Sequence, residues 1–153
     1  AALAKYGGPV IAGPRTGSKT EALTIPDGLA PGLLQDLIPV RVTRVESFRA
    51  GFSESVSLKP LQGAGAGARF DLGVWREWLE PADAPAWAPA GSPAPRAEVT
   101  AAYDDGAPAA VACEGRHYLG CYPTVGFLRA YISAVCEQRG LATHVLPGDL
   151  RLA

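Results

Sequence analysis

The stretch that most constrains this chain is residues 7–21, GGPVIAGPRTGSKTE. Its apolar residues 10–12 predict a short buried strand. The glycines and proline that follow predict a compact loop, because glycine tolerates positive φ and proline fixes φ. Among the loop's polar side chains are Arg15, Lys19 and Glu21. They stand at the carboxyl end of the strand, where open α/β sheets place their functional surface, so we expect a functional surface on this loop.

Several later segments also predict strands. Val40, Val42 and Val45 alternate with polar residues but slip once, which indicates a strand with a β-bulge. Residues 98–103 predict another strand. Glu114 and Gly115 form a two-residue turn, which predicts a hairpin of residues 109–113 and 116–121.

Three segments predict helices. Residues 1–6 look like the end of a helix stopped by two glycines, and residues 31–38 begin at a proline and end before another. Thr124 is typical of an N-cap, and Gly140 ends the helix that it begins. The apolar spacing predicts that the buried stripe of this last helix consists of Val125, Leu128, Ile132 and Val135.

The order of the motifs resembles that of a known family. GPRTGSKTE is followed by LLQDLIPVRVTRVESF, a W-x-x-W-L-E segment, AEVTAAYDDG and a hairpin that ends in YLGCY before a helix. This order resembles the middle domain of the bacterial β-galactosidases of glycoside hydrolase family 42. The chain departs from that family in lacking the domain's opening strand and helix, and in a longer, proline-rich segment at residues 81–95.

The resemblance implies a three-layer α/β domain that is flavodoxin-like or class I glutamine amidotransferase-like and incomplete at its amino-terminal end. Residues 1–143 would form this domain and residues 144–153 would lead into a carboxyl-terminal β domain. The resemblance also favours strands over residues 69–80, where Leu72, Trp75 and Leu79 fit a helical spacing equally well. Residues 81–95 predict a polyproline-like loop around Trp87, which packs in the core or meets a partner.

The resemblance implies a domain that mediates subunit assembly and catalyses no reaction. Such a domain follows a catalytic barrel, mediates a homotrimer and helps to wall the active-site entrance, with Arg15, Lys19 and Glu21 as the candidate interface or rim residues. The parent protein would hydrolyse terminal β-galactosyl linkages with retention. Arg15 has an equal alternative as a buried pin whose five N–H donors satisfy carbonyls at the strand end.

The residues themselves argue against nucleophilic catalysis. An amidotransferase needs a cysteine on a strand-to-helix elbow, but Cys113 precedes a turn, Cys121 ends a strand and Cys136 lies within a helix. Ser18 lies outside any G-x-S-x-G motif. The hairpin register separates Cys113 from Cys121 by roughly 16 Å, at about 3.3 Å per residue, so we expect three free, largely buried thiols.

Metal, cofactor and glycosidase chemistry also lack a pattern. His117 and His144 are isolated from each other and from other ligands, and the Gly-Ala run at residues 63–68 departs from a dinucleotide fingerprint. We therefore predict no metal and no cofactor. Glu21 and Glu80 are the candidate carboxylates for glycoside hydrolysis, but neither segment resembles a barrel strand end.

Composition restricts the partners. The net charge is −1, with 14 basic and 15 acidic residues scattered along the chain, which argues against nucleic acid. No apolar run reaches the roughly 20 residues that a membrane-spanning helix needs. The compartment cannot be read from the chain, and a cytoplasmic location is the default prediction.

Two other functions remain open. The chain could be a free-standing module of amidotransferase-like fold that binds a sugar or a protein, or a degenerate amidotransferase or hydrolase. An amino-terminal part that lacks the domain's first strand and helix would leave a sheet edge or an apolar face uncovered. We therefore also expect a surface that associates with other chains.

Overall fold

The structure, a computed structural model, describes residues 2–60, 67–82 and 96–143. The predictions for the loop around Trp87, for most of the Gly-Ala run and for residues 144–153 lie outside these ranges. Within them, no helix is both long enough and apolar enough to cross a membrane.

The main sheet has six strands in the order β1 (Val10–Ala12), β8 (Arg116–Leu119), β7 (Pro108–Cys113), β6 (Glu98–Tyr103), β3 (Glu54–Leu58) and β4 (Arg69–Leu72). The pair β1–β8 is parallel and every other pair is antiparallel. Within the described residues β1 pairs with β8 alone. The predicted α/β class is therefore confirmed in its coarse form, as a mixed α/β fold in which one strand pair among the described residues is parallel.

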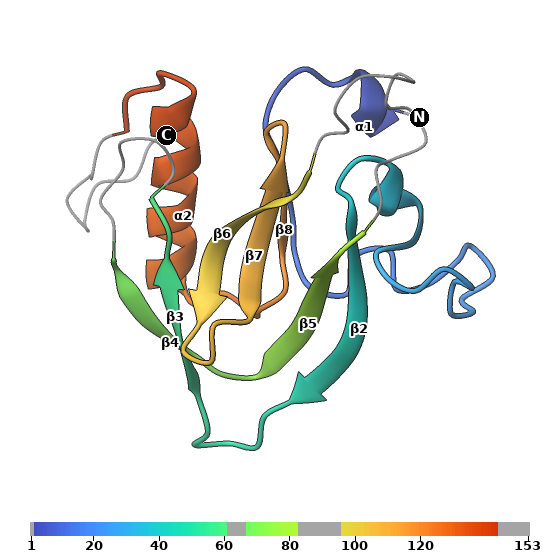
Figure 1. Ribbon diagram of the computed structural model, residues 1–153, viewed down its shortest axis with the longest axis horizontal. Coiled ribbons are helices and arrows are strands. Elements are labelled where there is room, and N and C mark those ends of the chain that lie inside the picture. The colour runs from blue at the N-terminus through green and yellow to red at the C-terminus, as the bar shows by residue number, and fades with distance from the viewer. Residues whose placement is uncertain (1, 61–66, 83–95, 144–153) are drawn as a thin grey trace, which may run out of the picture.

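Helix α2 (Val125–Gln138) and a two-stranded ribbon lie on opposite sides of the strands β6 to β8 (Figure 1). The ribbon pairs β2 (Val40–Ser47) with β5 (Trp75–Pro81) in antiparallel register. Along β8, Leu119 packs in the cluster under α2, whereas Tyr118 packs in the cluster under the ribbon. This alternation follows from the two-residue period of a strand and gives the sheet a core on each face.

Most predicted elements are present. A short helix α1 (Ala2–Lys5) precedes β1, and residues 69–80 form β4 and most of β5, as predicted. The pairing of β2 shifts between Val42 and Arg44, which confirms the predicted bulge, and Cys113 faces Arg116 across the predicted turn. The helix predicted over residues 31–38 is only a 3-10 turn, η1 (Gly32–Asp36), because Pro39 leaves it too short for a stable α-helix.

The buried stripe predicted for α2 is correct only in part, because Val135 is buried and Leu128 packs partly buried against the core, whereas the other two residues are exposed. Thr124 caps the helix as predicted, since its Oγ1 accepts the N–H of Phe127 at 3.4 Å. However, Val125 is 75% exposed and Ile132 is 43% exposed. The rings of Phe127 and Tyr131 stack at 5.7 Å and are fully buried, because aromatic rings bury more apolar area than aliphatic side chains. The described buried residues of α2 are Phe127, Tyr131, Ala134 and Val135.

A small polar cluster is buried between α2 and the sheet. The hydroxyl of Tyr131 lies 2.7 Å from Thr100 Oγ1 and 3.0 Å from His117 Nδ1. The other ring nitrogen of His117, Nε2, is buried and has no hydrogen-bond partner among the described residues. Burial, with a smaller contribution from nearby Arg139, lowers the pKa of His117 to about 4. The imidazole is therefore neutral in the folded chain.

This neutral histidine predicts acid sensitivity. The folded pKa of His117 lies below the unfolded value of 6.5, so the unfolded chain binds the extra proton first. We expect the free energy of unfolding to fall by roughly 3 kcal/mol from pH 6.5 to 4 through this residue. Urea denaturation at several pH values would show a flatter profile in this window for His117→Gln. The comparison is with the wild type, and a profile equally steep in His117→Gln would contradict the prediction.

Arg76 connects the ribbon to the main sheet. Its side chain is 3% exposed, and its Nη1 lies 2.7 Å from both carboxylate oxygens of Glu54, while its Nη2 lies 2.6 Å from Asp105. The guanidinium also stacks 4.1 Å from the ring centres of Trp78 and Tyr103. Burial opposes ionisation, but the bonds to the two carboxylates outweigh it and raise the pKa of Arg76. The arginine is therefore a charged clamp between β5, β3 and the β6–β7 turn.

Removal of this clamp is expected to be costly. Breaking a buried ion pair typically costs 3–5 kcal/mol, and because Glu54 and Asp105 keep access to water we expect about 2–3 kcal/mol for Arg76→Ala. The matched control is Arg69→Ala, which removes an exposed ion pair to Asp104 and should cost about 0–1 kcal/mol. Urea denaturation of both variants measures the difference. Equal losses would show that Arg76 does not connect the layers.

Candidate functional site

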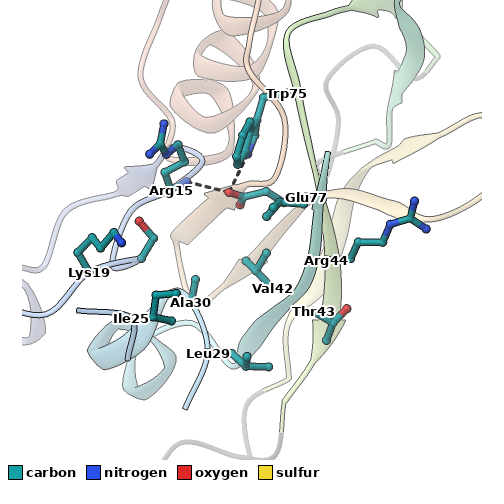
Figure 2. A pocket seen from close by; sticks show the side chains of 12 residues that line it. Arg15, Lys19, Ile25, Leu29, Ala30, Val42, Thr43, Arg44, Trp75 and Glu77 are labelled. Carbon is teal, nitrogen blue, oxygen red and sulfur yellow. Dashed lines mark hydrogen bonds between the residues drawn. The ribbon is translucent and has the colours of Figure 1, made fainter. Parts of the chain in front are cut away.

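A groove of about 370 Å³ lies beside the loop that follows β1. One wall comes from that loop and from residues 25–30, and the other from β2 and β5 (Figure 2). Arg15 and Lys19 lie on the same wall, whereas Arg44 lies on the opposite wall (Figure 2). Two of the three predicted site residues, Arg15 and Lys19, therefore share this groove. Glu21 is exposed and is not among the residues that line it.

The loop holds its shape through short-range bonds and one close approach. Its main chain turns twice, with Thr16 N–H bonded to Gly13 and Ser18 N–H bonded to Arg15. Gly17 has φ +68°, and a Cβ at this position would lie 1.9 Å from the carbonyl oxygen of Pro31. Only glycine fits there, because any side chain would push the loop away from the opposing main chain. The second glycine of the motif therefore fixes the loop against residues 26–32.

A buried carboxylate anchors the same loop. Glu77 on β5 is 1% exposed. Its Oε1 accepts the main-chain N–H of Arg15 and the indole N–H of Trp75, each at 2.9 Å, and its Oε2 accepts the hydroxyl of Tyr118 at 2.7 Å. Three donors replace the lost hydration of the charge. Glu77 thereby fastens the loop after β1 to both β5 and β8.

Arg15 occupies a strained position. Its φ is +66°, a conformation that costs a non-glycine residue about 1–2 kcal/mol. The bond from its N–H to Glu77 holds it there, while its guanidinium lies exposed, 5.4 Å from the ring centre of Trp75. The interpretation of Arg15 as a buried pin is therefore wrong, because the main-chain amide and not the guanidinium makes the buried bond. The side chain is free to meet a ligand.

Glu77 is not among the site residues predicted above, although the sequence carries a signal for it. Trp75, Glu77 and Leu79 alternate along β5, and a strand places such residues on one face. An acid between two large apolar residues on one face predicts a buried carboxylate that needs donors. The ambiguity between helix and strand for residues 69–80 hid this pattern.

The cysteines are poorly suited to nucleophilic chemistry. All three are free thiols, with Cys113 and Cys121 buried and Cys136 partly buried, as predicted. Burial, together with the nearby charge of Glu77, raises the pKa of Cys121 to about 12, and burial also raises the pKa of Cys113. Both thiols therefore stay protonated at neutral pH, whereas the thiolate is the nucleophile.

The carboxylates of Glu54, Asp105 and Glu80 are poorly suited to glycoside hydrolysis. Glu54 and Asp105 share Arg76, whose bond lowers the pKa of Asp105, while a glycosidase acid needs a raised one. Glu80 is exposed and accepts the Thr43 hydroxyl at 3.3 Å. Across residues 2–60, 67–82 and 96–143, no group of three or more histidines, cysteines or acids is placed to hold a metal ion.

The comparisons define the class of protein. The family model described as the beta-galactosidase trimerisation domain matches residues 1–142. A beta-galactosidase of Thermus thermophilus is 40% identical over 146 residues, which cover 95% of this chain and 19% of that protein. The chain belongs to the beta-galactosidase trimerisation domain family, and it spans about a fifth of the length of such relatives.

Solved structures agree with this assignment. A beta-galactosidase from the psychrophilic Marinomonas ef1 is 33% identical and superposes with a TM-score of 0.74 over 95% of this chain and 19% of its own. The beta-galactosidase of the haloarchaeon Halorubrum lacusprofundi is 28% identical, with a TM-score of 0.67 over 88% of this chain and 18% of its own. In both proteins the matching region is a small part of a longer chain.

The anchoring role of Glu77 can be measured at a single amide. In Glu77→Ala the N–H of Arg15 loses its charged acceptor, a bond worth about 1.5–3 kcal/mol, so it should exchange with solvent roughly tenfold faster or more. Hydrogen exchange followed by NMR measures this rate. Glu80→Ala removes an exposed acid from the same strand and should leave the Arg15 amide unchanged. Equal protection in both variants would contradict the role given to Glu77.

Proposed function

We propose that this chain is the assembly domain of a longer β-galactosidase and performs no chemistry of its own. The observation that carries the proposal is the family match over residues 1–142, combined with relatives of which the chain covers only 19%. The catalytic barrel would lie elsewhere in the parent protein, which would hydrolyse terminal β-galactosyl linkages with retention. The protonated cysteines and the carboxylates engaged by Arg76 support a chain without catalysis.

We propose that residues 1–143 form a flavodoxin-like or class I glutamine amidotransferase-like unit, and that residues 144–153 lead into a β domain. The parallel pair β1–β8, with a glycine-rich loop at the carboxyl end of β1, supports this relationship. A sheet with a helix on one face and further structure on the other is compatible with three layers.

The surface beside the groove supports an assembly role. Residues 23–33 follow the loop and carry large apolar side chains that water reaches. Their exposed fractions are 77% for Leu23, 71% for Ile25, 43% for Leu29 and 90% for Leu33. Clustered exposure of this kind marks interaction surfaces. We propose that this segment, together with Arg15, Lys19 and Glu21, meets a neighbouring subunit in a homotrimer or the rim of its active site.

A binding module is the second candidate. The groove lies beside Trp75 and is lined by polar and apolar side chains, a combination that suits a sugar or a peptide. This function would need no parent enzyme.

Assembly can be tested on the full-length protein. We expect a trimer that hydrolyses a β-galactoside, whereas the isolated chain should be inactive. Leu23→Asp with Leu33→Asp should lower the trimer fraction in sedimentation velocity, because the charges would be buried at the interface. The matched control is Val125→Asp, which is also exposed but lies at the start of α2.

Three results would overturn the proposal. The first is a full-length protein that remains monomeric. The second is activity of the isolated chain that is lost in Cys113→Ala or Cys121→Ala. The third is saturable sugar binding by the isolated chain, which would favour the binding module.

A further inference from the structure

Two cations in the groove lack an internal acceptor. Arg15 and Lys19 are both exposed, and neither forms an ion pair with any residue that the structure describes. Glu77 also lines the groove, but its two oxygens already accept from the Arg15 main chain, Trp75 and Tyr118. The guanidinium and ammonium N–H groups are therefore left to water or to a partner.

The third cation at this groove differs. Arg44 lies on the opposite wall (Figure 2), where its Nη2 is 3.7 Å from Glu46 Oε2 and its guanidinium stacks 4.4 Å from the ring centre of Trp78. The charge of Arg44 is thus paired with Glu46, whereas no ion pair among the described residues engages Arg15 or Lys19 on the other wall. Ile25 and Leu29 add apolar contacts to that wall.

In a trimer, the three-fold symmetry determines which surface of the next subunit contacts the wall that carries Arg15 and Lys19. A three-fold ring is closed by heterologous contacts, in which one patch meets a different patch of the next subunit. The cations of one copy therefore need not face the same cations of another, as they would near a two-fold axis. A surface of opposite charge on the next copy is the complement that such an interface favours.

We propose that the groove receives an exposed carboxylate side chain from a second copy of the parent protein, with Arg15 and Lys19 as its counter-charges. The inference rests on the assembly function proposed above and names the chemistry of the contact. Arg15 supplies a planar fork that binds both oxygens of a carboxylate, and Lys19 supplies a point charge. The bond from Glu77 to the Arg15 main chain fixes the position from which that fork extends.

The first experiment detects the contact directly. A full-length protein reassembled from equal amounts of ¹⁵N-labelled and unlabelled subunits is treated with a carbodiimide, which couples an ammonium to a carboxylate at contact distance. We expect mass spectrometry to find Lys19 joined to an aspartate or glutamate in labelled–unlabelled pairs. Lys19→Arg should lose the crosslink and keep the oligomer. The absence of a mixed pair from assembled wild-type protein, or crosslinks within one copy alone, would overturn the inference.

The second experiment measures what the charges contribute. Sedimentation equilibrium of full-length Arg15→Glu/Lys19→Glu should give a dissociation constant raised roughly tenfold or more, with a weaker dependence on NaCl than the wild type. The matched control is Lys5→Glu/Lys59→Glu, two exposed lysines outside the groove. Because the buried bond of Arg15 uses its main chain, the charge reversal leaves that bond in place.

The outcomes separate the two proposals. A trimer that resists the groove variant as well as the control overturns this inference and leaves the assembly function intact. A wild-type protein that is monomeric overturns both. A trimer that is equally stable in the groove variant but loses binding of a free anion such as inorganic phosphate would assign the cations to a small ligand, and that result also overturns the inference.

Discussion

The carboxylate of Glu77 is the interaction on which the candidate site depends. A buried charge is tolerated only where donors replace its hydration, and here the donors come from β5, from β8 and from the loop after β1. Each donor belongs to a different element, so satisfaction of one charge also fixes three elements relative to each other. The loop gains a defined position without burying any of its own side chains.

Neighbouring residues of β5 carry opposite charges to opposite faces of the strand. Glu77 turns toward Tyr118 and the loop, while Arg76 turns toward Glu54 and Asp105. Because successive side chains of a strand alternate, two adjacent residues can bind two separate sets of partners. β5 thereby attaches the ribbon to the main sheet through Arg76 and to the candidate site through Glu77. Disturbance of this one strand is expected to affect both.

The predictions from sequence succeeded where short-range chemistry determines the structure. The turn at Glu114 and Gly115, the cap at Thr124 and the bulge in β2 depend on neighbouring residues and were read correctly. The rotation of α2 and the partners of Glu77 depend on residues that are distant in the chain. Tyr131, for example, turns inward where its hydroxyl forms hydrogen bonds with Thr100 and His117, and no local pattern contains that information.

The strained conformation of Arg15 connects the fold to the proposed contact. A glycine at this position would adopt positive φ without cost, so the chain retains an arginine where the backbone favours another residue. Strain of this kind persists only where the surroundings hold it, and here the bond to Glu77 does so. The side chain that results is exposed, and no ion pair within the described residues engages it. The exposed guanidinium is therefore available to a group outside the described residues, which is what the proposed subunit contact would supply.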